Sequence, residues 1–305
     1  MNRWSVFLAL LLVVVAGCAG RPDVVEVDNT AFLERRGVTE PTVLQAAAEL
    51  DDGDEEQAFD RLVEWFRDPR TRQSQARPEA LFVAANALAE DGNTERAFYY
   101  LDELLDTYPD GTLFRPAAIR QYQLAVALLA RSRPAFSLGT GAGDFEALEM
   151  LFRIQQRVPG SDLAESALLL SADHYFARGD YDFAEDAYTV FVESYPRSDE
   201  IGRVRLRQAW SNLLQYQGPR YDPTSLLDAR AQFFDLKDAG VRQTPEIERA
   251  LAYIEEQFAQ KAESQAGWYR RTGHRDAAAR IMAEAEVRYA DVLSDDTDEE
   301  TADGS

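Results

Sequence analysis

Between residues 39 and 293, apolar positions recur at the three- and four-residue spacing of amphipathic helices. The clearest stretch runs from Leu163 to Ser198. Asp162 and Glu165 form a capping pair before its first apolar run, and Gly179 separates that run from the second. Tyr195-Pro196 closes the stretch, because proline cannot continue a helix. The pattern predicts two antiparallel helices joined at Gly179-Asp180.

Small and aromatic residues follow a fixed order in this predicted hairpin. In chain order, the positions are Leu168, Ala172, Tyr175, Gly179, Ala184, Tyr188, Phe191 and Pro196. The order resembles a tetratricopeptide repeat, in which small residues let two helices approach closely and aromatic residues fill the space beside them. We therefore expect Ala172 and Ala184 at the contact between the helices, with the aromatic residues in the core.

The same order recurs elsewhere in the chain. Two copies are Gly92, Ala97, Leu101, Leu104, Tyr108 and Pro109, and Ala266, Tyr269, Gly273, Ala278, Met282 and Tyr289. Two less complete copies are Gly53, Ala58, Leu62 and Trp65, and Gly143, Phe145, Leu148, Phe152 and Pro159. Each hairpin of such an array buries its apolar face only against its neighbours, so the pattern predicts an all-α, right-handed α-solenoid of about six helical hairpins.

The two ends of the chain have a different character. Residues 1–17 begin with Arg3 and continue with an apolar run, Trp4 to Val15, that is shorter than the ~20 residues a bilayer span needs. Val15-Ala16-Gly17-Cys18 matches the cleavage box of a lipoprotein signal peptide, so we expect lipidation at Cys18. An ordinary signal peptide with a chance cysteine is the alternative.

Three further segments lack a sustained helical pattern. Residues 18–38 are predicted to be a tether, 132–144 a glycine-rich loop and 294–305 an acidic, disordered tail.

Together, the lipoprotein box, the tether and the hairpins resemble the BamD-like outer-membrane lipoproteins. The likeness covers residues 163–292 and rests on the stretch Ala266 to Gly273, on Asp222-Pro223 before Ala229, and on closings such as Tyr195-Pro196. The resemblance implies a lipid-anchored scaffold on the periplasmic side of the outer membrane. Its expected partners are a BamA-type barrel and unfolded outer-membrane proteins. A related class coordinates peptidoglycan synthesis with the Tol-Pal system, and the sequence leaves both functions open.

The charge and the reactive residues narrow the function further. A net charge of −22 argues against a nucleic-acid partner and against polybasic adhesion to a membrane. Cys18 is the only cysteine, so the sequence offers no internal disulfide and no thiol metal site. His174 and His274 fall in different repeats, and no nucleophile has an adjacent base. We therefore expect no metal, no cofactor and no enzymatic activity, with an enzyme as the least favoured alternative.

The candidate partner-binding residues lie on the first helix of their hairpins, at positions that face the inner side of a repeat superhelix. They are Phe82, Asn86, Asp173, Phe176 and Arg270. Aromatic side chains beside polar groups are typical of peptide recognition. Two interpretations stay open: these side chains bind a partner, or divergent repeats and the long loop cover them.

Overall fold

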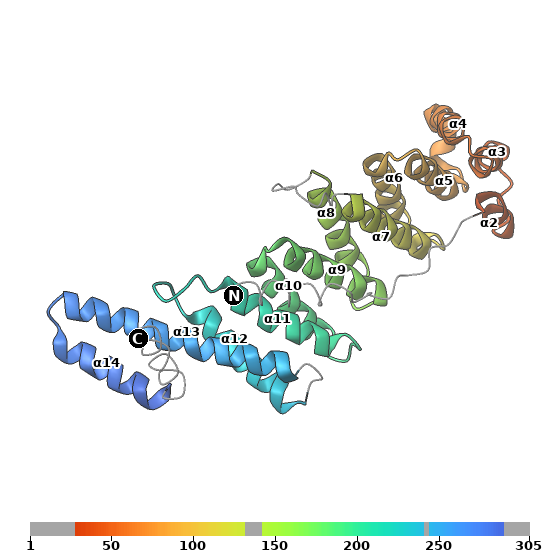
Figure 1. Cartoon of the computed structure of the whole chain (residues 1–305). Helices are drawn as coiled ribbons and strands as arrows, with labels where there is room; N and C mark the ends of the chain where they lie inside the picture. Colours follow the sequence, from red (N-terminus) through yellow and green to blue (C-terminus); the bar gives the residue numbers. More distant parts are fainter. Residues whose placement is uncertain (1–27, 132–141, 241–243, 290–305) are drawn as a thin grey trace. The chain divides into compact units, whose positions relative to one another are not determined.

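The computed structural model describes residues 28–131, 142–240 and 244–289 (Figure 1). These residues form thirteen α-helices and one short 3-10 helix, and they contain no strand. The prediction of an all-α fold is confirmed, whereas the handedness of the solenoid stays a prediction. The signal peptide, Cys18, most of the predicted loop 132–144 and the acidic tail lie outside the described residues.

The chain divides into two units, with the boundary after Leu170. The first unit contains α2 (Asn29–Arg35), α3 (Pro41–Asp51), α4 (Glu55–Arg67), η1 (Pro69–Gln73), α5 (Arg77–Glu90), α6 (Thr94–Thr107), α7 (Phe114–Arg131) and α8 (Ala142–Arg157). The boundary falls inside α9 (Asp162–Arg178). The second unit continues with α10 (Tyr181–Ser194), α11 (Ile201–Gln215), α12 (Thr224–Asp238), α13 (Thr244–Arg271) and α14 (Arg275–Arg288).

Consecutive helices pair into hairpins within each unit. In the first unit α3 packs on α4, α5 on α6 and α7 on α8, and the hairpins contact one another through α4 with α5 and α6 with α7. In the second unit α11 packs on α12 and α13 on α14, while α10 contacts α11 and α12 contacts α13. This nearest-neighbour pattern is the one that a helical repeat array requires.

The turn between α9 and α10 shows how glycine fixes a hairpin. Gly179 has a φ of 83°, a conformation that other residues rarely adopt. Its amide donates to the carbonyl of Phe176, and the amide of Asp180 donates to the carbonyl of Tyr175. These bonds use carbonyls that would otherwise be unpaired at the helix end. Gly273 has a φ of 89° at the corresponding turn between α13 and α14.

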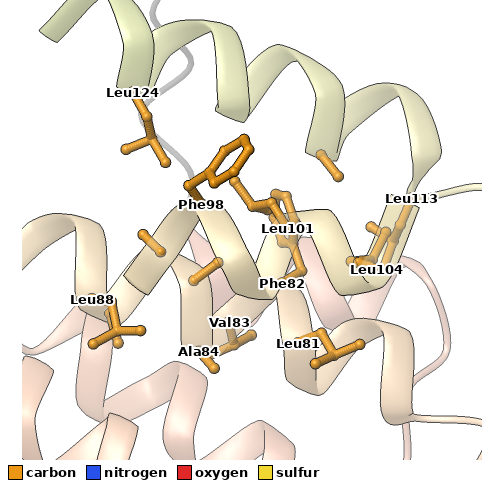
Figure 2. Close-up of a cluster of buried hydrophobic side chains, with 14 of the residues drawn as sticks. Leu81, Phe82, Val83, Ala84, Leu88, Phe98, Leu101, Leu104, Leu113 and Leu124 are labelled. Carbon is orange, nitrogen blue, oxygen red and sulfur yellow. The ribbon is translucent and has the colours of Figure 1, made fainter. Parts of the chain in front are cut away.

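Each unit has its own apolar core. Figure 2 shows part of the core of the first unit, where Phe82 of α5, Phe98 and Leu101 of α6, and Leu124 of α7 meet. In the second unit, buried side chains from α11, α12 and α13 form a separate cluster around Phe233. Within the described ranges, no helix combines the length and the apolar character needed to cross a bilayer.

The segment before Gly37 differs from the predicted tether. Residues 29–35 form α2, and the side chain of Leu33 in this helix is fully buried. This helix packs on α3 (Figure 1). The prediction of a tether over residues 18–38 is therefore wrong for 29–35, because a Phe-Leu pair in that segment finds apolar partners in the first unit.

The register predicted for the α8 copy of the repeat is also corrected. Phe145 and Phe152 were expected at packing positions, but these side chains are 73% and 57% exposed. The buried face of α8 consists instead of Ala147, Met150, Leu151 and Ile154. The helix begins at Ala142, so Gly143 lies inside it and does not form the turn that the motif places there.

Candidate protein-binding surfaces

Two of the five predicted partner-binding residues, Phe82 and Asn86, are buried in the first unit. Phe82 is 3% exposed, and its ring lies 5.4 Å from the ring of Phe32 on α2. Asn86 is 4% exposed and donates to the side-chain oxygen of Asn29, also on α2, at 2.9 Å. The expectation that Phe82 and Asn86 are open to a partner is therefore wrong, because α2 contacts both side chains.

Asp173 and Phe176, on α9, belong to a polar and aromatic cluster in the second unit. The Tyr188 hydroxyl on α10 donates to Asp173 Oδ1 at 2.7 Å. From α11, Arg203 Nη1 donates to Asp173 Oδ2 at 2.9 Å and Arg207 Nη1 donates to Oδ1 at 2.9 Å. The Arg207 guanidinium also lies over the Phe176 ring, 5.3 Å from its centroid. The cluster ties three helices together through one carboxylate.

The electrostatics of this cluster raise the pKa values of Tyr188 and Arg203. Burial, and then the charge of Asp173, raises the pKa of Tyr188 well above its ordinary value. Burial alone would lower the pKa of Arg203, but the charge of Asp173 and hydrogen bonds to Glu200 and Asp173 raise it. The buried Nη2 atom of Arg203 has no hydrogen-bond partner in the structure. Because these groups neutralise one another, the cluster serves first to hold the helices in place.

Arg270, the fifth predicted residue, is exposed in the last turn of α13. Beside it in sequence, Trp268 is 53% exposed, and its ring lies 4.9 Å from that of Tyr269. Tryptophan and arginine are each enriched among the residues that dominate binding energy in protein interfaces. Trp268 and Arg270 are two positions apart in the helix, so they lie on different faces of α13. Arg270 is therefore accessible, and its contact with a partner stays a prediction.

The residues predicted to pack the repeats have the following environments. Ala97, Ala172, Ala184 and Tyr188 are fully buried, and Ala278 is nearly so. Tyr175 and Tyr269 are half-buried, and Tyr175 packs on Phe183 with ring centroids 5.4 Å apart. Gly179 and Gly273 occupy the turns described above.

Several exposed apolar side chains were not among the candidates from the sequence. They are Tyr99, Phe145 and Phe152 in the first unit, and Phe183, Val190, Tyr221, Leu227 and Phe234 in the second. On α12, Leu227 and Phe234 are seven residues apart and so lie on the same helix face. Helical spacing alone does not distinguish such outward-facing residues from core residues, so the sequence carried no separate signal for them.

The described ranges hold no cluster of three or more His, Cys, Asp or Glu side chains able to bind a metal ion. An open hollow of about 1080 Å³ lies beside α4 and η1, and its lining includes Arg61, Glu64, Arg67, Asp68 and Arg70. Arg67 pairs with Glu64 and Arg70 with Asp68. Such paired charges are typical of a solvated face.

The hairpins, their glycine turns and the buried small residues define a helical repeat protein of the tetratricopeptide type. The family model described as "YfiO: Outer membrane lipoprotein" matches residues 141–297, which is just over half of the chain. The chain belongs to this family of outer-membrane lipoproteins, the BamD family.

Comparison with other known proteins adds little to this assignment. A solved structure titled "MamA RS-1 ArsTM double mutant" is similar at 17% sequence identity, with a TM-score of 0.32. The similarity covers 70% of this chain and 97% of that one. No curated protein matches the chain.

Proposed function

We propose that this protein is a non-catalytic, lipid-anchored scaffold that faces the periplasm and binds partner proteins during the assembly of outer-membrane β-barrels. The observation that carries the proposal is the family match over residues 141–297. Its partners would be a BamA-type barrel and unfolded outer-membrane proteins. The lipid would be attached at Cys18.

Two features support a scaffold in preference to an enzyme. The family is one of tetratricopeptide-like lipoproteins that act as scaffolds. The described residues carry exposed aromatic side chains on ordered helices, Trp268 among them. Rigid helical faces with exposed aromatic anchors suit protein recognition, because little conformational entropy is lost on binding.

Depletion of the protein tests the proposed role in barrel assembly. Removing a component of a common assembly machine should lower the amounts of several unrelated β-barrel proteins together, while periplasmic proteins stay constant. The measurement is quantitative mass spectrometry of isolated outer membranes at successive times after depletion. Unchanged barrel levels with altered cell-wall crosslinking would contradict the proposal and favour the alternative scaffold role in coordinating peptidoglycan synthesis with the Tol-Pal system.

A variant at the exposed end of α13 connects that role to a surface. Trp268→Ala should weaken crosslinking to a barrel partner by roughly thirtyfold, since an aromatic anchor typically carries about 2 kcal/mol. Arg280→Ala, at an exposed arginine of α14, is the matched control. Equal capture by both variants and the wild type would exclude this surface.

A further inference from the structure

The short helix α2 lies on a surface built by the first helices of the repeat hairpins. Its contacts come from one side chain at the end of α3, three side chains of α5 and one residue just before α7. We call these residues the α2-contact surface: Asp51, Glu79, Phe82, Asn86 and Thr112. Most of the family match lies outside the first unit, since that match begins at residue 141.

At its N-terminal end, α2 is held by a carboxylate from another helix. Asp51 Oδ1 accepts from the backbone and side-chain amides of Asn29 at 2.8 and 3.0 Å, and Oδ2 accepts from the Thr30 amide at 2.8 Å. These first-turn amides have no partner inside the helix. The surface therefore binds the start of a helix. Asn86 adds a hydrogen bond to the side chain of the first helical residue, Asn29.

The middle and the C-terminal end of α2 meet an aromatic ring and a second carboxylate. Phe32 packs on Phe82, and Arg36 donates to Glu79 Oε1 through Nε at 3.3 Å and Nη2 at 3.1 Å. Arg36 also donates to the Thr112 hydroxyl. The surface is acidic at both ends and apolar between them, which suits a short amphipathic helix with a basic residue near its C-terminus.

As an occupant of this surface, α2 leaves one polar atom of the surface unpaired. Glu79 is 8% exposed, and its buried Oε2 atom has no hydrogen-bond partner, because both bonds from Arg36 reach Oε1. A buried polar atom left unpaired costs free energy, and an arginine that binds both oxygens of a carboxylate recovers it.

The length of α2 also limits how firmly it is held. A helix of seven residues is shorter than the roughly 12–15 residues that make an isolated helix even marginally stable. Once its contacts break, α2 therefore loses its helical structure as well. Local opening of this kind needs less free energy than unfolding of the hairpins beneath it.

We propose that the α2-contact surface is a binding site for a short helical segment of a partner protein, and that this segment displaces α2. The segment begins with a small polar residue, carries an aromatic-leucine pair and ends in an arginine that reaches both oxygens of Glu79. The proposal rests on the proposed scaffold function in that it requires a protein partner. It adds a site in the first unit and the chemistry of the segment that fits there.

The test uses the full-length protein in detergent and a fluorescent peptide with the sequence of residues 28–38. Phe32→Ala with Leu33→Ala loosens α2 and should raise peptide affinity at least about tenfold over the wild type, because α2 no longer competes for the surface. Adding Glu79→Gln should reverse this gain about tenfold through loss of the charged partner. Glu103→Gln, at an exposed glutamate of α6, is the matched control and should change nothing.

Two outcomes would contradict the proposal. Absence of peptide binding in a loosened variant with unchanged helical circular dichroism overturns it. Dimerisation of that variant by exchange of α2 would identify a second copy as the occupant and also overturn it.

A second measurement decides the matter if the loosened variant loses helicity. Hydrogen exchange of the wild type should show α2 amides exchanging at least about tenfold faster than those of α5. Equal protection would make α2 a fixed part of the fold. None of these results depends on barrel levels after depletion, so the scaffold function and this site fail separately.

Discussion

Asp173 accepts hydrogen bonds from three side chains on two other helices of the second unit. A single, partly buried carboxylate thereby links α9 to α10 and α11. Removing one partner of such a cluster leaves an uncompensated charge. The loss of folding free energy is then larger than when the whole cluster is replaced by apolar residues. Ala184, one helical turn before Tyr188, is fully buried, and its small side chain suits close packing of helices.

Tyr188 should make stability fall at high pH. Burial, and then the charge of Asp173, raises its pKa in the folded state, so the unfolded chain releases the proton first, near pH ~10. Stability from this group is complete below about pH 10 and is lost as pH rises towards the folded pKa, by about 1.4 kcal/mol per pH unit. Tyr188→Phe should make the decline in unfolding free energy shallower by that amount in urea titrations. Tyr221→Phe, at an exposed tyrosine, should leave the slope unchanged.

Ala184→Leu should destabilise the second unit by about 1–3 kcal/mol through overpacking. Ala184 is fully buried, so the added atoms have no free space. Ala177→Leu, at an exposed position of the preceding helix, is the control and should be within about 0.5 kcal/mol of wild type. Chemical denaturation measures both, and equal midpoints for the two variants would contradict the assigned contact.

At the scale of single elements, the sequence predicted those hairpins best whose turn is fixed by a glycine. Gly92, Gly179 and Gly273 all have positive φ, and the helices beside them begin and end close to the predicted residues. For α8 the motif assigned the turn to Gly143, which lies inside the helix, so the predicted face was rotated. Where no glycine with a positive φ marks the turn, helical spacing alone is compatible with more than one register.

The candidate site was less predictable than the fold for a related reason. Phe82 and Asn86 contact α2, which lies about fifty residues earlier in the chain and is too short to show a period. Burial by such a distant segment leaves no local pattern. The polar contacts of Asp173 likewise come from arginines thirty and thirty-four residues further on.

The corrected register of α8 predicts opposite effects for two of its residues. Met150 is 1% exposed, so Met150→Ala should cost about 2–5 kcal/mol of unfolding free energy through the cavity it leaves. Phe152→Ala removes an exposed ring and should cost less than about 1 kcal/mol. Urea unfolding of the two variants provides the comparison. A larger loss for Phe152→Ala would restore the register that the motif suggested.

The molecule as a whole is strongly acidic, and it belongs to a family of outer-membrane lipoproteins. A net charge of −22 repels anionic lipid surfaces, so charge does not hold this protein at a membrane. In the described residues no helix is able to span a bilayer. The lipid that we propose at Cys18 is a separate means of attachment, and a substitution can test it.

Cys18→Ala should consequently move the protein out of the outer-membrane fraction, or leave it with an uncleaved signal peptide. One acyl chain binds a membrane only marginally, so stable attachment needs the several chains that a lipoprotein carries. The measurement is fractionation of envelopes after a high-salt wash, combined with metabolic fatty-acid labelling of the wild type. The labelling separates the two signal-peptide interpretations directly. A wild type that takes up no fatty acid carries an ordinary signal peptide, and its association with the membrane then depends on a protein partner, which the salt wash would release.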